Sequence, residues 1–210
     1  MLAVQNWATQ QGIQITAPQV EKLAAHRHMV LEKNKVMNLT AITCSTAFET
    51  KHIIDSLSVL PFIPHGAQLA DIGTGAGFPG IVIAIMRPDV QVTLVDSLRK
   101  RVIFLQEVVE AISLPNVTAI HARAEDMARQ GHSFDICTAR AVAHMQKLAK
   151  WVLPLTKRGG TFLAMKGPAI QEELETATPT ITKLGARITA VHAVTLQPGL
   201  VHSIVEVLRA

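Results

Sequence analysis

The feature that constrains this chain most is a glycine-rich stretch, Leu69–Gly80, which leads into the apolar run Ile81–Met86. An apolar strand ends in Asp71 and opens into a stretch with four glycines. The chain enters a helix there through Pro79, a residue suited to a first helical turn. Glycines adopt positive φ without strain and let backbone approach a ligand closely. A helix N-terminus beyond them offers free N–H groups. The stretch therefore predicts a site for a nucleotide-type cofactor.

Composition narrows the class of protein. The 210 residues are 49% hydrophobic and 17% charged, which is typical of a globular chain. A net charge of +4 permits an anionic partner. Two cysteines make no disulfide framework, the first residues do not resemble a signal peptide, and the longest apolar run falls far short of the ~20 residues of a membrane helix. We expect a cytoplasmic protein without a membrane segment.

The order of expected elements predicts an α/β fold. An amphipathic helix over 17–36 and a second helical segment over 45–60 precede alternating strands and helices. The expected strands cover 68–71, 91–95, 117–121, 134–138, 160–166, 187–194 and 200–207, and the expected helices cover 79–86, 98–112, 144–152 and 169–184. Alternation of this kind indicates a mostly parallel sheet covered by helices on both faces.

The last two expected strands differ from the others because only a Gln-Pro-Gly turn separates them. They should form an antiparallel hairpin at the sheet edge. A seven-stranded, mostly parallel sheet with such a hairpin is the Rossmann-like class I fold of methyltransferases that use S-adenosylmethionine (SAM). We expect residues 1–60 to form a helical extension packed on a methyltransferase domain, 61–210.

The glycine loop matches two cofactor patterns. Residues 75–80 fit the dinucleotide motif G-x-G-x-x-G, and Asp96 follows about 20 residues later, where a ribose-binding acid is expected. SAM sites share this layout. Three features favour SAM: an acid, Asp71, directly before the glycines; an additional glycine on the strand side; and Ala124-Glu125 after the third strand, on the adenine side. Plain turn geometry for Gly73 and Gly80, and a helix cap for Asp96, remain alternatives.

Further short motifs occur in one order along residues 30–170: Met37–Thr40, His52–Leu57, Asp71–Gly80, Asp96–Arg101, Arg123–Glu125, Phe134-Asp135, Thr138–Ala141 and Met165–Gly167. In this combination the chain resembles the bacterial RsmG (GidB) methyltransferases. The resemblance implies methyl transfer from SAM to N7 of a guanine in the 530 loop of 16S rRNA, within the RNA or the 30S subunit. Family members often carry an arginine before the last strand, where this chain has Pro198–His202.

The residues fit that chemistry. Guanine N7 carries an in-plane lone pair and no proton, so methyl transfer to it needs placement and electrostatic support and no general base. After the fourth strand the chain reads Thr138–Ala141 in place of the Asn/Asp-Pro-Pro-aromatic clamp of amino-group methyltransferases. Cys137 lies within an apolar strand, so we interpret it as a buried structural thiol and not as a nucleophile.

Two basic residues are the candidates for positioning the acceptor base. Arg140 ends the fourth strand, at the sheet edge where ligands of open α/β sheets bind. Its guanidinium could hold guanine O6, an RNA phosphate or the cofactor carboxylate, or form a structural salt bridge with Asp71 or Asp135. Lys166 ends the fifth strand at the same edge, and an exposed strand end is its alternative.

Three other groups keep two interpretations each. Arg99, Lys100 and Arg101 oppose the helix dipole, and they either contact RNA phosphates or form a solvated face. His52 and Asp55 share a helix face, and they either dock the N-terminal helices or contact cofactor or RNA. Phe78 either stacks on a base or packs in the core.

The expected site is then as follows. The cofactor residues are Asp71, Gly73, Thr74, Gly75, Gly77, Phe78, Asp96, Ala124, Glu125 and Arg140, and the RNA contacts are Arg99, Lys100, Arg101 and Lys166. We expect a monomer without a metal. The alternatives are an NAD-type oxidoreductase, which the absence of tyrosine disfavours; a non-catalytic rRNA assembly factor; and a small-molecule SAM methyltransferase.

Overall fold

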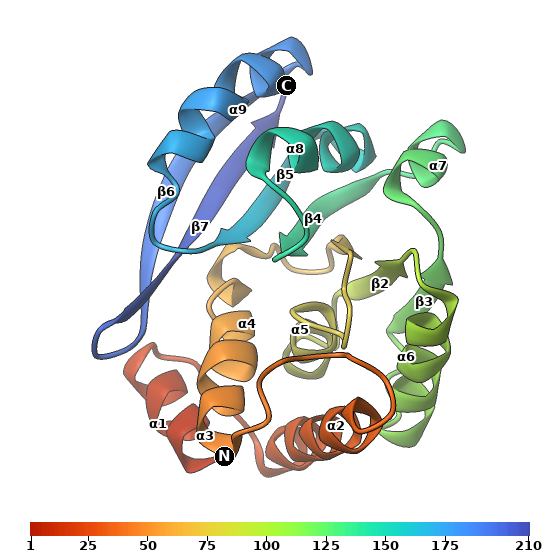
Figure 1. Cartoon of the computed structure of the whole chain (residues 1–210), viewed down its shortest axis with the longest axis vertical. Coiled ribbons are helices and arrows are strands. Elements are labelled where there is room, and N and C mark those ends of the chain that lie inside the picture. Colours follow the sequence, from red (N-terminus) through yellow and green to blue (C-terminus); the bar gives the residue numbers. More distant parts are fainter.

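A computed structural model describes all 210 residues and contains one seven-stranded sheet (Figure 1). Its order is β3-β2-β1-β4-β5-β7-β6. The strands are β1 (Gln68–Ile72), β2 (Gln91–Asp96), β3 (Val117–His121), β4 (Phe134–Arg140), β5 (Thr156–Lys166), β6 (Ala186–Gln197) and β7 (Leu200–Arg209). The seven strands expected from the sequence are all present, and the predicted fold class is confirmed.

The sheet is parallel except at one end. Strands β1 to β5 pair in parallel, whereas β7 pairs antiparallel with both β5 and β6. The hairpin turn holds Gly199 at φ +77°, a value that glycine adopts without strain. The predicted hairpin is confirmed with one correction, since only β6 lies at the edge and β7 is inserted beside β5.

The helices are α1 (Leu2–Gln10), α2 (Ala17–Asn34), α3 (Ser45–Phe48), α4 (Asp55–Leu57), α5 (Gly80–Met86), α6 (Arg99–Ala111), α7 (Ala124–Arg129), α8 (Met145–Val152) and α9 (Gln171–Lys183). The sequence did not predict α1 or α7. The single helix expected over 45–60 is divided, because a π-helical segment, η1 (Glu49–Ile54), joins α3 to α4. A 3₁₀ turn, Leu60–Phe62, follows, and the expected boundary at residue 60 falls within it.

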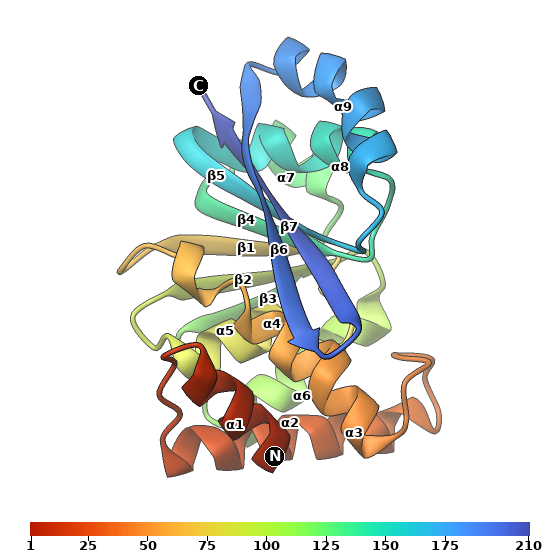
Figure 2. The same cartoon turned by 90° about the vertical axis from the view of Figure 1, so that its left-hand side faces the viewer.

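Two apolar layers cover the two faces of the sheet (Figure 2). One contains Leu23 of α2, Ile83 of α5 and Phe104 of α6, and it extends to Val4 of α1. The other contains Met127 of α7, Leu148 of α8 and Leu174 of α9. The N-terminal helices therefore share a continuous core with the sheet. None of the helices is long and apolar enough to cross a bilayer.

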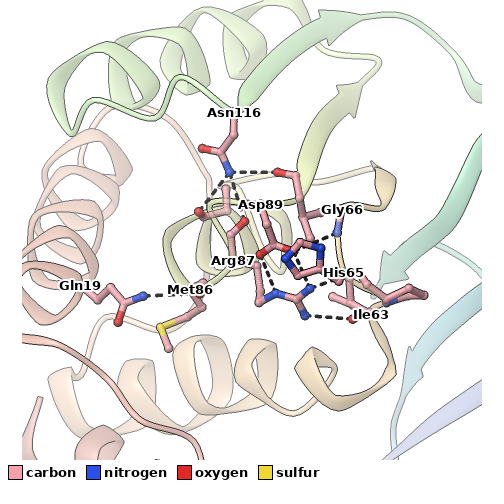
Figure 3. A network of polar contacts seen from close by, with 11 residues as sticks. Gln19, Ile63, His65, Gly66, Met86, Arg87, Asp89 and Asn116 are labelled. Carbon is pink, nitrogen blue, oxygen red and sulfur yellow. Dashed lines mark hydrogen bonds and ion pairs between the residues drawn. The ribbon is translucent and has the colours of Figure 1, made fainter.

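A polar network holds the turn between α5 and β2 in place (Figure 3). The buried Asn116 side chain donates to the carbonyl oxygens of Ala84, Arg87 and Val90 at 3.0–3.3 Å. The Arg87 guanidinium donates to Ile63 O at 2.9 Å and binds Asp89 at 2.7 Å. The bond to Ala84 O satisfies a carbonyl that the end of α5 leaves without a helical partner, and the other bonds fix the turn that follows.

We expect Asn116→Ala to lower the free energy of unfolding by about 1–3 kcal/mol, because buried carbonyl oxygens lose their donor. Urea denaturation monitored by circular dichroism measures the change. Gln130→Ala is the control, since Gln130 is exposed. Equal stability of the two variants would contradict the role given to Asn116.

Candidate active site

The Asp71 carboxylate anchors the glycine loop. Asp71 lies one residue before the end of β1 and is fully buried. It accepts hydrogen bonds from Thr74 Oγ1 at 2.6 Å, from Gly80 N at 2.8 Å and from Thr138 Oγ1 at 3.2 Å. These contacts join the loop, the first residue of α5 and strand β4. The carboxylate is thus directed into the protein. Direct contact between Asp71 and the cofactor stays a prediction.

A pocket of about 170 Å³ opens at the carboxyl ends of β1, β2 and β3. Asp96 lies on its wall and accepts hydrogen bonds from Gly75 N at 3.0 Å and Leu98 N at 2.9 Å. The carboxylate thus ties the glycine loop to the turn before α6. The full lining is Ile72, Gly73, Val95, Asp96, Ser97, Ala122, Arg123, Ala124, Glu125, Val142 and Trp151.

Four of the predicted cofactor residues line this pocket together: Gly73, Asp96, Ala124 and Glu125. The sequence prediction missed Val142 and Trp151, which reach the pocket from the loop after β4 and from α8. No motif marks either residue. The only signal that could have found Val142 is its position just after a strand that ends at the ligand-binding edge.

Other predicted loop residues face inward. Thr74 is buried beneath the loop, and a Cβ on Gly77 would lie 2.6 Å from the Ile81 side chain. Phe78 is 3% exposed and stacks on His52 with ring centroids 4.8 Å apart. Of the two interpretations of Phe78, the structure supports the second, because its ring packs in the core.

Arg140 ends β4 and is bound to the N-terminal helical region. Its Nη1 donates to Lys51 O and lies 3.0 Å from Asp55 Oδ2, and its Nη2 lies 3.0 Å from His52 Nδ1. The guanidinium also lies 5.3 Å from the centroid of Phe78. The structural salt bridge considered for Arg140 does exist, but its partner is Asp55 and not Asp71 or Asp135.

His52 and Asp55 perform the docking considered for them. Burial lowers the pKa of His52 to about 3, and the Arg140 charge adds to this, so the ring is neutral at neutral pH. Nδ1 then accepts from Arg140, and Nε2 donates to Thr40 Oγ1 at 2.8 Å. The other Asp55 oxygen lies 2.9 Å from His202 Nδ1 on β7. His202 therefore connects the hairpin strand β7 to this junction.

The backbone just after Arg140 is strained. Ala141 has φ +53°, in the left-handed region that residues with a Cβ rarely adopt. This turn directs Arg140 toward the N-terminal helices, whereas Val142 lines the pocket. Arg140 and the pocket-lining Val142 thereby lie on either side of one sharp bend.

The remaining basic candidates differ in their surroundings. Lys166 Nζ donates to Ala143 O at 2.8 Å and pairs with Glu173 at 2.7 Å, so its charge is engaged within the protein and it is not an exposed strand end. Arg101 is half-buried and lies 3.5 Å from Asp96. Arg99 and Lys100 are exposed, so the three-residue basic cluster is divided.

The Cys137 thiol is fully buried, and burial raises its pKa to about 12. A protonated, inaccessible thiol is no nucleophile, which agrees with its predicted structural role. No group of three or more His, Cys, Asp or Glu side chains is placed to hold a metal ion.

The pocket suits the adenosine part of SAM. Asp96 offers carboxylate oxygens to ribose hydroxyl donors, and six of the 11 lining residues are hydrophobic, as a purine requires. A Cβ added at position 73 would lie 2.7 Å from Val142 Cγ2, which is too close for an ordinary contact. Only glycine therefore allows the loop to pack against Val142. The volume of the pocket is below the roughly 300–1,000 Å³ of a site for a whole drug-sized ligand, so the pocket has room for only part of a SAM molecule.

The Asp71 carboxyl allows a test of the loop by pH. Burial raises its pKa from 3.8 to about 6, against the opposing effect of its hydrogen bonds. The folded protein then binds the proton more tightly than the unfolded chain, and the free energy of unfolding falls as pH rises from about 4 to 6. Asp71→Asn cannot ionise, so its stability lacks this dependence on pH. From about pH 4 to about pH 7, the free energy of unfolding of the variant should therefore rise by about 3 kcal/mol relative to that of the wild type.

Denaturant unfolding across this pH range measures the difference. Asp89→Asn is the control of opposite sign, because the Arg87 hydrogen bond holds the pKa of Asp89 well below its usual range. Its carboxylate stabilises the fold above about pH 4, and this contribution is lost as pH falls. A pH-independent difference between the wild type and Asp71→Asn would refute the assignment.

Sequence comparison identifies close relatives. A family model described as GidB, rRNA small subunit methyltransferase G, matches residues 19–201. The "Ribosomal RNA small subunit methyltransferase G" of Clostridium botulinum (strain Eklund 17B / Type B) is 47% identical over 182 residues, which are 84% of this chain and 76% of the relative. That of Desulfitobacterium hafniense (strain Y51) is 46% identical over 180 residues, 84% of this chain and 75% of the relative.

Structural comparison supports the same fold. M. jannaschii TYW2 in complex with AdoMet, which is SAM, has a TM-score of 0.60 at 17% identity and covers 81% of this chain and 80% of its own. A precorrin methyltransferase from Geobacter metallireducens has a TM-score of 0.56 at 15% identity, covering 74% and 86%. The fold is thus that of SAM-dependent methyltransferases. With a match over most of its length and relatives at 47% identity, the chain belongs to the GidB family of rRNA small subunit methyltransferases.

Proposed function

We propose that this chain transfers the methyl group of SAM to N7 of a guanine in the 530 loop of 16S rRNA. The observation that carries the proposal is the Arg140 guanidinium, fixed at the carboxyl end of β4, one residue from the bend that leads to the pocket. The family gives the reaction class, and the resemblance of the motifs gives the acceptor. The proposed setting is the cytoplasm, where the protein acts as a monomer without a metal.

In the proposed complex, Asp96 binds the ribose and the start of α7 borders the adenine. Backbone groups of Gly73 and Gly75 face the methionyl part, together with the loop that Asp71 and Thr74 hold in place. SAM supplies an electrophilic methyl group on a sulfonium. The task of the protein is to bring the acceptor nitrogen in line with that methyl and to exclude other geometries.

Arg140 has the donors that this task requires. A guanidinium carries five N–H groups, and three of them are directed at Lys51 O, Asp55 and His52. Nε–H and one Nη2–H remain for a ligand such as guanine O6 or a phosphate oxygen. The internal contacts fix the plane of the guanidinium in advance, so little side-chain entropy is lost when the base binds.

No proton has to be removed from the acceptor, because N7 of guanine carries none. His52 is neutral and uses both ring nitrogens for Arg140 and Thr40, so it serves as a positioning residue. Arg99 and Lys100 are the exposed cations proposed to contact RNA phosphates. Lys166, held by Glu173, positions the loop after β4 through its bond to Ala143 O.

Transfer of labelled methyl from SAM to 30S subunits that lack the modification tests the proposal, with the product mapped by N7-specific strand cleavage. We expect label at one guanine of the 530 loop. Arg140→Ala should lower the rate roughly a hundredfold, as the loss of one transition-state donor does. Arg158→Ala, at an exposed position near the amino end of β5, is the control.

Two outcomes would contradict the proposal. SAM binding without label on 30S subunits or free 16S rRNA would exclude the rRNA acceptor and leave the small-molecule or assembly-factor alternatives. Label at a guanine that resists N7-specific cleavage would keep the enzyme and change the accepting atom.

Gly73→Ala should abolish measurable SAM binding, because its Cβ would lie 2.7 Å from Val142 Cγ2 and the residue has φ +68°. Gly66→Ala is the matched control: Gly66 has the same φ, and nothing lies within 4 Å of its Cβ position. Both variants lose about 1–2 kcal/mol of stability from the left-handed backbone, but only Gly73→Ala should lose the cofactor in calorimetric titration. Adding Val142→Ala should restore part of the affinity.

A further inference from the structure

The pocket contains one aromatic residue, Trp151, that has no part in the contacts proposed above for SAM and RNA. Trp151 lies near the end of α8 and is half-buried. It lines the pocket together with Val142 and with residues at the carboxyl ends of β1 and β2. Figure 1 shows α8 beside α7, the helix whose first residues also border the pocket.

The chain covers part of the Trp151 ring by itself. Lys147, one helical turn earlier on α8, places its ammonium 4.9 Å from the indole centroid. A cation over an aromatic face is attracted by the ring quadrupole, and residues four apart share a helix face. Lys147 therefore lies over one face of the indole, and Trp151 also borders the pocket.

The pocket is chemically divided. Asp96 and Ser97 are polar, whereas the apolar part of the lining includes Ile72, Val95, Val142 and Trp151. A ribose requires the first kind of surface and a purine requires the second. Purine rings also have a π face on which an indole can stack.

We infer that Trp151 is the aromatic wall of the adenine subsite and contacts the base of SAM. The inference rests on the proposed function, because it requires SAM to occupy this pocket. Trp151 then holds the adenosine end of the cofactor, while the glycine loop and Arg140 serve the methyl-bearing end. Its contribution is to cofactor affinity and to the choice of a purine base.

Tryptophan fluorescence, excited where adenine does not absorb, tests the contact directly. The chain contains two tryptophans, and Trp7 is buried against β6, where its Nε1 donates to Thr195 O. In Trp7→Phe the signal comes from Trp151 alone, and we expect S-adenosylhomocysteine and adenosine to change it, whereas methionine does not. In Trp151→Phe the same ligands should leave the remaining emission unchanged. If Trp7→Phe is unfolded, the wild type minus Trp151→Phe gives the same signal.

Calorimetric titration with SAM measures the energetic part. Trp151→Ala should weaken binding about tenfold, the effect of removing one base–aromatic stack, and Trp151→Phe should recover part of that loss. Circular dichroism shows whether each variant is folded. If the wild type binds SAM but neither Trp151 emission nor the affinity of Trp151→Ala changes, the inference is wrong and the proposed function stands. If the wild type does not bind SAM, both fail.

Discussion

The site depends on one buried carboxylate. Asp71 accepts hydrogen bonds from the loop through Thr74, from α5 through Gly80 and from β4 through Thr138. Burial of an ionisable group without solvent is unfavourable, and these three donors offset part of that cost. The same contacts that keep the carboxylate inside the protein therefore determine the path of the loop. Asp96 holds that loop from the other side through Gly75 N.

A second junction connects the N-terminal helices to the reaction site. Arg140 of β4 meets Asp55, His52 and the Lys51 carbonyl, and Asp55 also meets His202 of β7. Three regions distant in the sequence thus meet at one junction, in which Asp55 links Arg140 to His202. The π-helical segment Glu49–Ile54 supplies two of these contacts, in agreement with the frequent occurrence of such segments at functional sites. Removal of the N-terminal helices would leave Arg140 without its partners.

Much of the fold could be predicted because it depends on patterns that are local in the sequence. Strands such as β3 are apolar runs bounded by turn residues, and the glycine loop and Asp96 have a spacing that few sites share. Helix α7 was missed because its six residues are too few to show a periodicity. Phe78 was assigned to a ligand because its place in the loop is visible in the sequence, whereas its burial against His52 depends on a helix more than 20 residues away.

The sequence by itself determined the fold class, the cofactor and the family, since these depend on local conformation: glycines where φ is positive, an acid at the end of each of two strands, and alternating strands and helices. Only the tertiary structure decided which of these residues face a ligand. Burial directs Asp71 and Phe78 inward, ion pairs engage Lys166 and Arg101, and packing brings Val142 and Trp151 to the pocket. The physical reason is that the direction of a side chain at a strand end is set by its neighbours in space, and these come from distant segments of the chain.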